Sequence, residues 1–144
     1  MNVKCFAHMS LLMLSSMAHA DDVADVKAEF NKLIEYQKTD DDRILNLFSV
    51  DCSVQITTVE GSVQNTRSIP MDMFRRMLLR ANRLKTGSRD KYENVKFGQD
   101  GDSIRVRATI VDGISGHRGP FLLRYVRGSD GLMKIKDFQV TTGK

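Results

Sequence analysis

The first part of the chain has apolar residues at helical spacing. From about residue 22 they recur at intervals of three and four, which places them along one side of a helix. Asp21, Asp22 and Asp25 come at its start, where the helix dipole favours negative charge. The pattern predicts an amphipathic helix over residues 22–37 with a buried side made of Val23, Val26, Phe30, Leu33, Ile34 and Gln37.

Two shorter helices are predicted before the strands of the last third. Residues 39–42 break the first helix, and an aspartate there can cap a second one whose buried face is Ile44, Leu45, Leu47 and Phe48. Ser68 and Pro70 are suited to the start of a third helix, which Gly87 ends. Its apolar stripe is Met73, Phe74, Met77, Leu78, Ala81 and Leu84, and its remainder is Arg75, Arg76, Arg80 and Arg83.

Alternation of apolar and polar residues predicts strands elsewhere. Residues 53–59 are rich in β-formers, and residues 62–67 after the turn at Glu60-Gly61 are either a paired strand or a loop. Asp100-Gly101 is a strong hairpin signal, and a second turn is expected at residues 129–131. These turns separate predicted strands at 91–98, 103–112, 120–127 and 132–141.

The order of these elements predicts an α+β fold. About three helices in the N-terminal half, each with one apolar stripe, need a common surface to cover. A curved antiparallel sheet supplies that surface, with the helices packed on one face. We find no sign of a second domain or of internal repeats.

The first twenty residues have the pattern of a secretory signal. Lys4 provides the positive start, residues 11–14 are apolar, and Ala18-His19-Ala20 fits a cleavage site. The apolar run is too short to span a bilayer, and the alternative is the amphipathic start of a cytosolic protein. We therefore expect a protein of the periplasm or a secreted protein, with residues 21–144 as one domain.

Charge and cysteine content exclude several classes of function. Loss of Lys4 leaves 21 basic and 18 acidic residues, a net charge of +3. These charges are mixed along the chain, which does not favour nucleic acid. Cys52 is then the only cysteine and reads as a packed small residue. One remaining histidine, His117, makes a poor metal site, so we expect neither metal nor cofactor.

Two segments resemble the nuclear transport factor 2-like superfamily. Asp-Arg-Ile-Leu-Asn-Leu-Phe-Ser-Val-Asp-Cys-Ser-Val over residues 42–54 resembles the entry into its first strand, and residues 127–135 resemble its closing hairpin, with Met133 in place of a tryptophan. The resemblance implies a cone-shaped domain with an internal pocket. The superfamily includes ketosteroid isomerases, dehydratases, epoxide hydrolases, polyketide cyclases and non-enzymatic adaptors. The place of the isomerases' general base falls near Ile56 or Thr57, which cannot take a proton.

Four residues are candidates for lining such a pocket. If Lys134 and Lys136 face outward, alternation turns Asp137 inward, where burial would raise its pKa; the alternatives are a salt bridge or a shift in the strand. His117 lies on a glycine-rich loop, where it could donate or accept protons at the pocket rim. The alternative is that it is simply exposed to solvent. Tyr36 and Tyr92 complete the set, either lining the pocket or packing with their hydroxyls in water.

The outer face of the sheet is predicted to be partly apolar and basic. Residues 121–126 are apolar on both faces, whereas a sheet covered on one side should alternate cleanly. Such a surface implies a partner or a second copy, and the resemblance implies dimerisation through this face. The predicted interface consists of Arg105, Arg107, Leu122, Arg124, Lys134, Lys136 and Phe138.

These observations favour a non-catalytic binding or scaffold domain over an enzyme. It would act through its outer sheet face as a homodimer or on a partner protein, with room for a small apolar ligand in the cone. Superfamily members in periplasmic secretion machinery are an analogy for such a role. The alternative is a small-molecule isomerase, dehydratase or hydrolase using Asp137, His117 or Tyr36 in the pocket.

Overall fold

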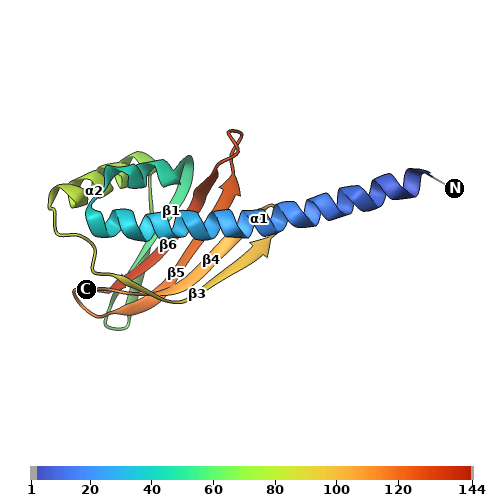
Figure 1. The fold of residues 1–144 in the computed structure, drawn as a ribbon. Helices are drawn as coiled ribbons and strands as arrows, with labels where there is room; N and C mark the ends of the chain where they lie inside the picture. The colour runs from blue at the N-terminus through green and yellow to red at the C-terminus, as the bar shows by residue number, and fades with distance from the viewer. Residues whose placement is uncertain (1–2, 144) are drawn as a thin grey trace.

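The computed structural model describes the backbone of residues 3–143 and the side chains of residues 21–143. The predicted order of elements is confirmed over this range, and the segment after Gly61 is a strand (Figure 1). In chain order the elements are α1 (Val3–Thr39), the 3-10 helix η1 (Asp42–Leu47), β1 (Phe48–Glu60), β2 (Val63–Ile69), α2 (Met71–Arg83), β3 (Lys91–Asp100), β4 (Ser103–Val111), β5 (Arg118–Arg127) and β6 (Met133–Gly143).

The six strands form one curved, unclosed sheet whose helices lie over one face (Figure 1). The strand order is β2-β1-β6-β5-β4-β3, so β2 and β3 are the two edges. All neighbouring pairs are antiparallel except β1 and β6, which run parallel. The predicted fold class is therefore confirmed, with one parallel pair where the last hairpin brings β6 back beside β1.

Helix α1 packs its predicted stripe against the sheet. Val26, Phe30 and Leu33 are at most 3% exposed. The helix ends where Asp40 adopts a positive φ of 52°, and the Asp40 carboxylate accepts a hydrogen bond from the Gly87 amide at 2.9 Å. Only glycine fits at that position, because a Cβ on Gly87 would lie 2.6 Å from the Lys38 carbonyl oxygen.

The start of the predicted mature chain is fixed to the last hairpin. The Arg127 guanidinium pairs with the carboxylates of Asp22 and Asp25, the second at 2.8 Å, and donates to the Gly131 carbonyl oxygen at 2.5 Å. These contacts join α1 to the turn between β5 and β6 immediately after the predicted cleavage site.

The short helix and α2 are joined by a partly buried hydrogen bond. Asp41 caps η1 by accepting a hydrogen bond from the Arg43 amide at 2.9 Å, which confirms the predicted aspartate cap. Asn82 of α2, 8% exposed, donates to the Asp42 carboxylate at 2.9 Å. Asn82 and Phe74 are the buried residues of α2, and together they define which side of the helix faces inward and hence its rotation about its axis.

That rotation makes the predicted stripe of α2 wrong in part. Phe74 enters the core, with its ring 5.3 Å from Phe48 and 5.2 Å from Phe138. Met71 and Leu78 pack on the same side, but Met73 and Met77 are each 45% exposed. Ala81 and Leu84, also predicted to be buried, are exposed.

A bulge in β6 overturns the predicted alternation of that strand. Arg124 pairs with Asp137 and Tyr125 pairs with Ile135, so Lys136 is an extra residue in β6. Beyond this bulge the faces exchange. Asp137, predicted to point inward, lies on the outer face, and Phe138, predicted to lie on the outer face, is 7% exposed in the core.

The predicted signal, residues 1–20, lies outside the residues whose side chains are described. Within the described part of the chain, none of the helices combines the length and apolarity that a membrane span requires.

Candidate functional site

The space between helices and sheet is filled with aromatic side chains. Phe121 is the centre of this cluster, with its ring 5.0 Å from Tyr92 and 5.6 Å from Phe138. Phe30 packs on the other side of Tyr92 at 5.6 Å. Five hollows among the described side chains open on the surface, and Phe121 lines none of these five. The internal ligand pocket that the resemblance implies is not among them.

Two tyrosine side chains lie in this core, and their hydroxyls differ in hydrogen bonding. The Tyr92 hydroxyl donates to the Gln37 side-chain oxygen at 2.7 Å, and burial raises the pKa of Tyr92. Tyr125 is fully buried, and its hydroxyl has no hydrogen-bond partner among the described residues. Burial, and then the nearby charge of Glu29, raise the pKa of the Tyr125 phenol. Neither phenol ionises near neutral pH.

Asp137 is not an interior carboxylate. It pairs with Arg124 across the outer face, and its side chain is 26% exposed. The alternative roles for Asp137, a salt bridge and a shifted strand, are both found, because the bulge at Lys136 moves the residue outward. A base in the cone would have to come from another residue.

His117 and Tyr36 lie at opposite ends of β5. His117 packs over Gly143, where a Cβ would come 2.5 Å from its ring, and its Nε2 has no partner among the described residues. Tyr36 lies beneath the Arg43 guanidinium at 4.9 Å and lines a hollow with Lys134, beyond the other end of β5. The structure therefore does not bring the four predicted pocket residues together.

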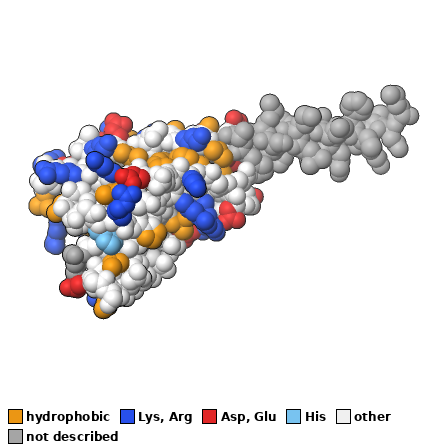
Figure 2. Space-filling view, turned by 90° about the horizontal axis from the view of Figure 1, so that it is seen from below, with side chains coloured by type: hydrophobic (Ala, Val, Ile, Leu, Met, Phe, Trp, Pro, Cys, Tyr) orange, Lys and Arg blue, Asp and Glu red, His pale blue; other side chains and the backbone are white. Residues whose placement is uncertain are grey.

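The outer face of the sheet divides into a neutral and a basic half. Across β1, β6 and β5, Gln55 pairs with Gln139, which pairs with Leu122. Further across, Leu122 pairs with Arg107 of β4 and Arg107 with Lys96 of β3. The view from below in Figure 2 shows Lys and Arg side chains in several clusters with hydrophobic side chains between them.

The neutral half contains a repeated pattern that the sequence analysis missed. Gln-x-Thr occurs in β1, β2 and β6, and alternation turns both side chains of each copy outward. Thr57 pairs with Thr66 and with Thr141, and the Thr57 and Thr66 hydroxyls are hydrogen-bonded at 2.8 Å. Together the three copies line a hollow of about 270 Å³, with Gln55, Thr57, Gln64, Thr66, Gln139 and Thr141 beside Pro120, Leu122 and Val140. The repetition of Gln-x-Thr along the sequence was the signal that could have revealed this hollow.

The predicted interface residues separate into three groups. Arg105, Arg107, Leu122 and Arg124 lie on the outer face, where Arg105 pairs with Asp100 at 2.7 Å. Lys134 and Lys136 turn to neighbours, binding the Asn46 carbonyl oxygen and the Asp51 carboxylate. Phe138 belongs to the core.

Two titratable groups lie next to the bulge of β6. The ammonium of Lys136, and then the hydroxyl of Ser49, lower the pKa of Asp51 to about 2. Burial, and then the charges of Asp137 and Asp51, raise the pKa of the Cys52 thiol to about 12. Cys52 is thus protonated at neutral pH and is a weak nucleophile.

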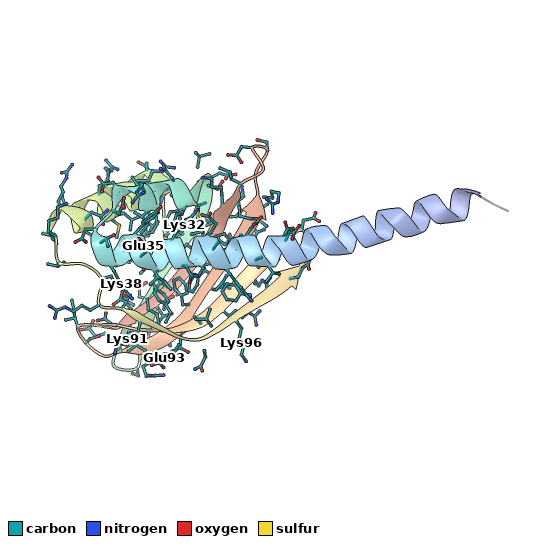
Figure 3. The ribbon with its side chains drawn as sticks, viewed as in Figure 1. Lys32, Glu35, Lys38, Lys91, Glu93 and Lys96 are labelled. Atoms are coloured by element: carbon teal, nitrogen blue, oxygen red, sulfur yellow. The ribbon has the colours of Figure 1, made fainter. Side chains whose placement is uncertain are left out.

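The edge at β3 carries mixed charges. β3 has an irregular register between Glu93 and Lys96, where Asn94 takes a positive φ of 53°. Lysines and a bulge on an edge strand oppose addition of a further strand. Figure 3 labels three charged side chains of β3, Lys91, Glu93 and Lys96, and three of α1, Lys32, Glu35 and Lys38. Among the described residues, we find no group of His, Cys, Asp and Glu that could hold a metal ion.

Comparison with known proteins establishes the fold. No protein-family model and no curated protein matches the sequence. The structure is similar to the beta subunit of a candidate aromatic-ring-hydroxylating dioxygenase from Novosphingobium aromaticivorans, with 15% identity over 89% of this chain and 92% of that one and a TM-score of 0.63. It is also similar to a candidate dehydratase of the NTF2-like family from Streptomyces avermitilis, with 15% identity over 85% and 96% and a TM-score of 0.61.

A third similar structure is a candidate ketosteroid isomerase from Parabacteroides distasonis. It shares 10% identity over 81% of this chain and 83% of that one, with a TM-score of 0.56. The chain thus has the fold of NTF2-like proteins, as the resemblance implied. Because these proteins include isomerases and dehydratases as well as proteins of unknown function, the fold leaves the activity open.

Proposed function

We propose that this is an exported, non-catalytic binding domain that associates with a second copy of itself through the outer face of its sheet. The observation that carries the proposal is the placement of Leu122. It lies on the outer face beside the Gln-x-Thr hollow, while Phe121 and Leu123 on either side fill the core. An apolar residue beside exposed side-chain amides and hydroxyls favours a protein contact at this place.

Charge favours a particular position for the two-fold axis. In a symmetric dimer, a residue close to the axis faces its own copy. An axis through Arg107 would bring guanidinium groups together, and like charges oppose such an arrangement. An axis through Gln139, whose neighbours across the sheet are Gln55 and Leu122, places neutral groups at the centre and leaves Arg105 and Arg107 two strands away.

The enzyme alternative loses support from the placement of its residues. Asp137 lies outside the cone, His117 and Tyr36 lie at opposite ends of β5, and the Tyr92 hydroxyl is bonded to Gln37. General acid–base chemistry needs such groups within hydrogen-bond reach of one substrate. The aromatic filling of the core likewise gives no support to an apolar ligand in the cone.

Export to the periplasm or the medium is part of the proposal and rests on residues 1–20. Expression of the full chain with sequencing of the mature N-terminus tests it directly. Cleavage after Ala20 is expected, so the purified protein should begin at Asp21.

Sedimentation equilibrium of the purified protein tests self-association. We expect the wild type to have about twice the mass of one chain and Leu122→Arg to have the mass of one chain, because the two new arginines, one from each copy, would meet near the axis without a partner. Ile114→Arg is the matched control, since Ile114 is 95% exposed on the loop before β5. A wild type that is monomeric, or an equal effect of both substitutions, would refute the dimer.

A further inference from the structure

Helix α2 has an exposed surface that the proposed dimer does not use. We call Met73, Arg76, Met77, Arg80 and Arg83 the Met-Arg face. Their spacing of three and four residues puts them on one side of the helix, opposite the side that enters the core. All five are exposed, and the two methionines are 45% exposed. Large apolar side chains in such positions favour contact with a partner.

The face has an excess of positive charge. Helix α2 contains four arginines and one acidic residue, Asp72. Arg76 pairs with Asp72 at 3.2 Å, with both side chains about three-quarters exposed, so water weakens the pair. Among the described residues, Arg80 and Arg83 have no ion pair, and they lie one helical turn apart. Like charges at that spacing repel, and a bound carboxylate would relieve the repulsion.

The composition of the face favours a protein segment as its anionic partner. An open hollow of about 530 Å³ lies here, lined by the Met-Arg face and Leu79. Methionine side chains adapt to varied apolar shapes, and arginine binds carboxylates with two parallel hydrogen bonds. A peptide can offer carboxylates and apolar side chains together at matching spacing.

We propose that the Met-Arg face binds an acidic protein segment. Its carboxylates pair with Arg80 and Arg83, and its apolar side chains enter the hollow between Met73 and Met77. The partner is thus a different protein, or a region of one, that combines acidic and apolar residues at short spacing. This inference does not depend on the dimer, because α2 and the outer face of the sheet share no residues.

Fluorescence anisotropy with synthetic peptides tests the proposal. The probe is a labelled helical peptide with Leu at positions i, i+3, i+4 and i+7 and Glu elsewhere. Two counterparts replace all Glu by Lys or all Leu by Ser. We expect the Glu/Leu peptide to bind, the Lys counterpart to fail and the Ser counterpart to bind about tenfold more weakly, because each loses one of the two kinds of contact.

Variants of the protein locate the binding. Arg80→Glu combined with Arg83→Glu should weaken binding of the Glu/Leu peptide by at least about tenfold, and Met77→Ser by about threefold. Arg67→Glu is the matched control, since Arg67 is exposed on β2, and it should leave binding unchanged. Leu122→Arg should also leave it unchanged, which separates this proposal from the dimer. A thermal melt by circular dichroism identifies any variant that has unfolded.

Three results would overturn the proposal. The first is no binding of the Glu/Leu peptide to the folded wild type. The second is an equal loss with Arg67→Glu and with the double variant, which would indicate attraction to net charge alone. The third is that the wild type does not bind the peptide but is retained on phosphatidylglycerol vesicles, while the double variant is not retained. That result would replace the peptide with a membrane surface.

Discussion

The two faces of β5 present neighbouring residues to different surroundings. Phe121, Leu123 and Tyr125 point inward and are at most 2% exposed, whereas Leu122 and Arg124 point outward beside glutamine, threonine and arginine. The strand is apolar on both faces for two separate reasons. The inner residues hold the fold together, and the outer leucine is available for a contact between molecules. Substitutions on the inner face should therefore mainly lower stability, and substitutions on the outer face should mainly weaken association.

The largest difference is expected between Phe121 and Leu122. Phe121→Ala should lower the free energy of unfolding by about 3–5 kcal/mol, because it leaves a cavity among packed rings. Leu122→Ala should change it by less than about 0.5 kcal/mol when the chain is monomeric. Urea unfolding at low protein concentration measures both. Equal losses would mean that Leu122 belongs to the core of the single chain.

The same two faces can be compared at β1 by measuring how fast a thiol on each face reacts. Cys52 is buried with a pKa of about 12, while its neighbour Ser53 is exposed on the outer face. In the Ser53→Cys variant the new thiol should react with a maleimide at pH 8 roughly a thousandfold faster than Cys52. The rates are followed by mass spectrometry. Rapid labelling of Cys52 in the folded protein would show that this part of the sheet opens.

Removing the hydroxyl should raise the free energy of unfolding at Tyr125 and lower it at Tyr92, both on the inner side of the sheet. Tyr125→Phe should stabilise the protein by about 1 kcal/mol, because it removes a buried hydroxyl without a partner. Tyr92→Phe should destabilise it by about 1 kcal/mol, because it removes the hydrogen bond to Gln37. Chemical unfolding of both variants provides the comparison. A loss of stability in Tyr125→Phe would indicate that a water or ligand bonds to its hydroxyl.

The smallest effect concerns the ion pair at the bulge. The Lys136 ammonium holds the pKa of Asp51 at about 2, below the usual 3.8. Because the pKa is lower in the folded state, this contribution to stability is complete above pH 3.8 and is lost as the pH falls toward 2. The urea midpoint of Asp51→Asn should therefore decline less than that of the wild type over this interval. Parallel curves for the two proteins would show that the pair does not persist in solution.

Periodicity was sufficient to predict most of the fold. The stripe of α1 from Val26 to Leu33 and the inward residues of β4 follow directly from spacing, because regular helices and strands keep their period. The hairpin at Asp100-Gly101 follows from turn chemistry, since Gly101 takes a positive φ of 59°. These features depend on local rules that residues near in sequence satisfy among themselves.

The remainder depends on contacts between distant residues. The bulge at Lys136 reverses the faces of Asp137 and Phe138, and alternation cannot reveal where an extra residue enters a strand. The apolar stripe of α2 was wider than its contact area, so Met73 was assigned to the core although Phe74 and Asn82 occupy the buried side of the helix. The Gln-x-Thr copies are neutral and common, and only the pairing of strands brings them together.

Cross-linking probes the proposed two-fold contact over the neutral half of the outer face. A short bis-maleimide should join Gln139→Cys chains into covalent dimers, because Gln139 pairs with Leu122 near the proposed axis and Cys52 is buried. Arg107→Cys, two strands away from Gln139, should remain largely uncross-linked. Covalent dimers are expected for Gln139→Cys alone. Preferential cross-linking of Arg107→Cys, or cross-linking of neither variant in the folded protein, would refute the two-fold contact.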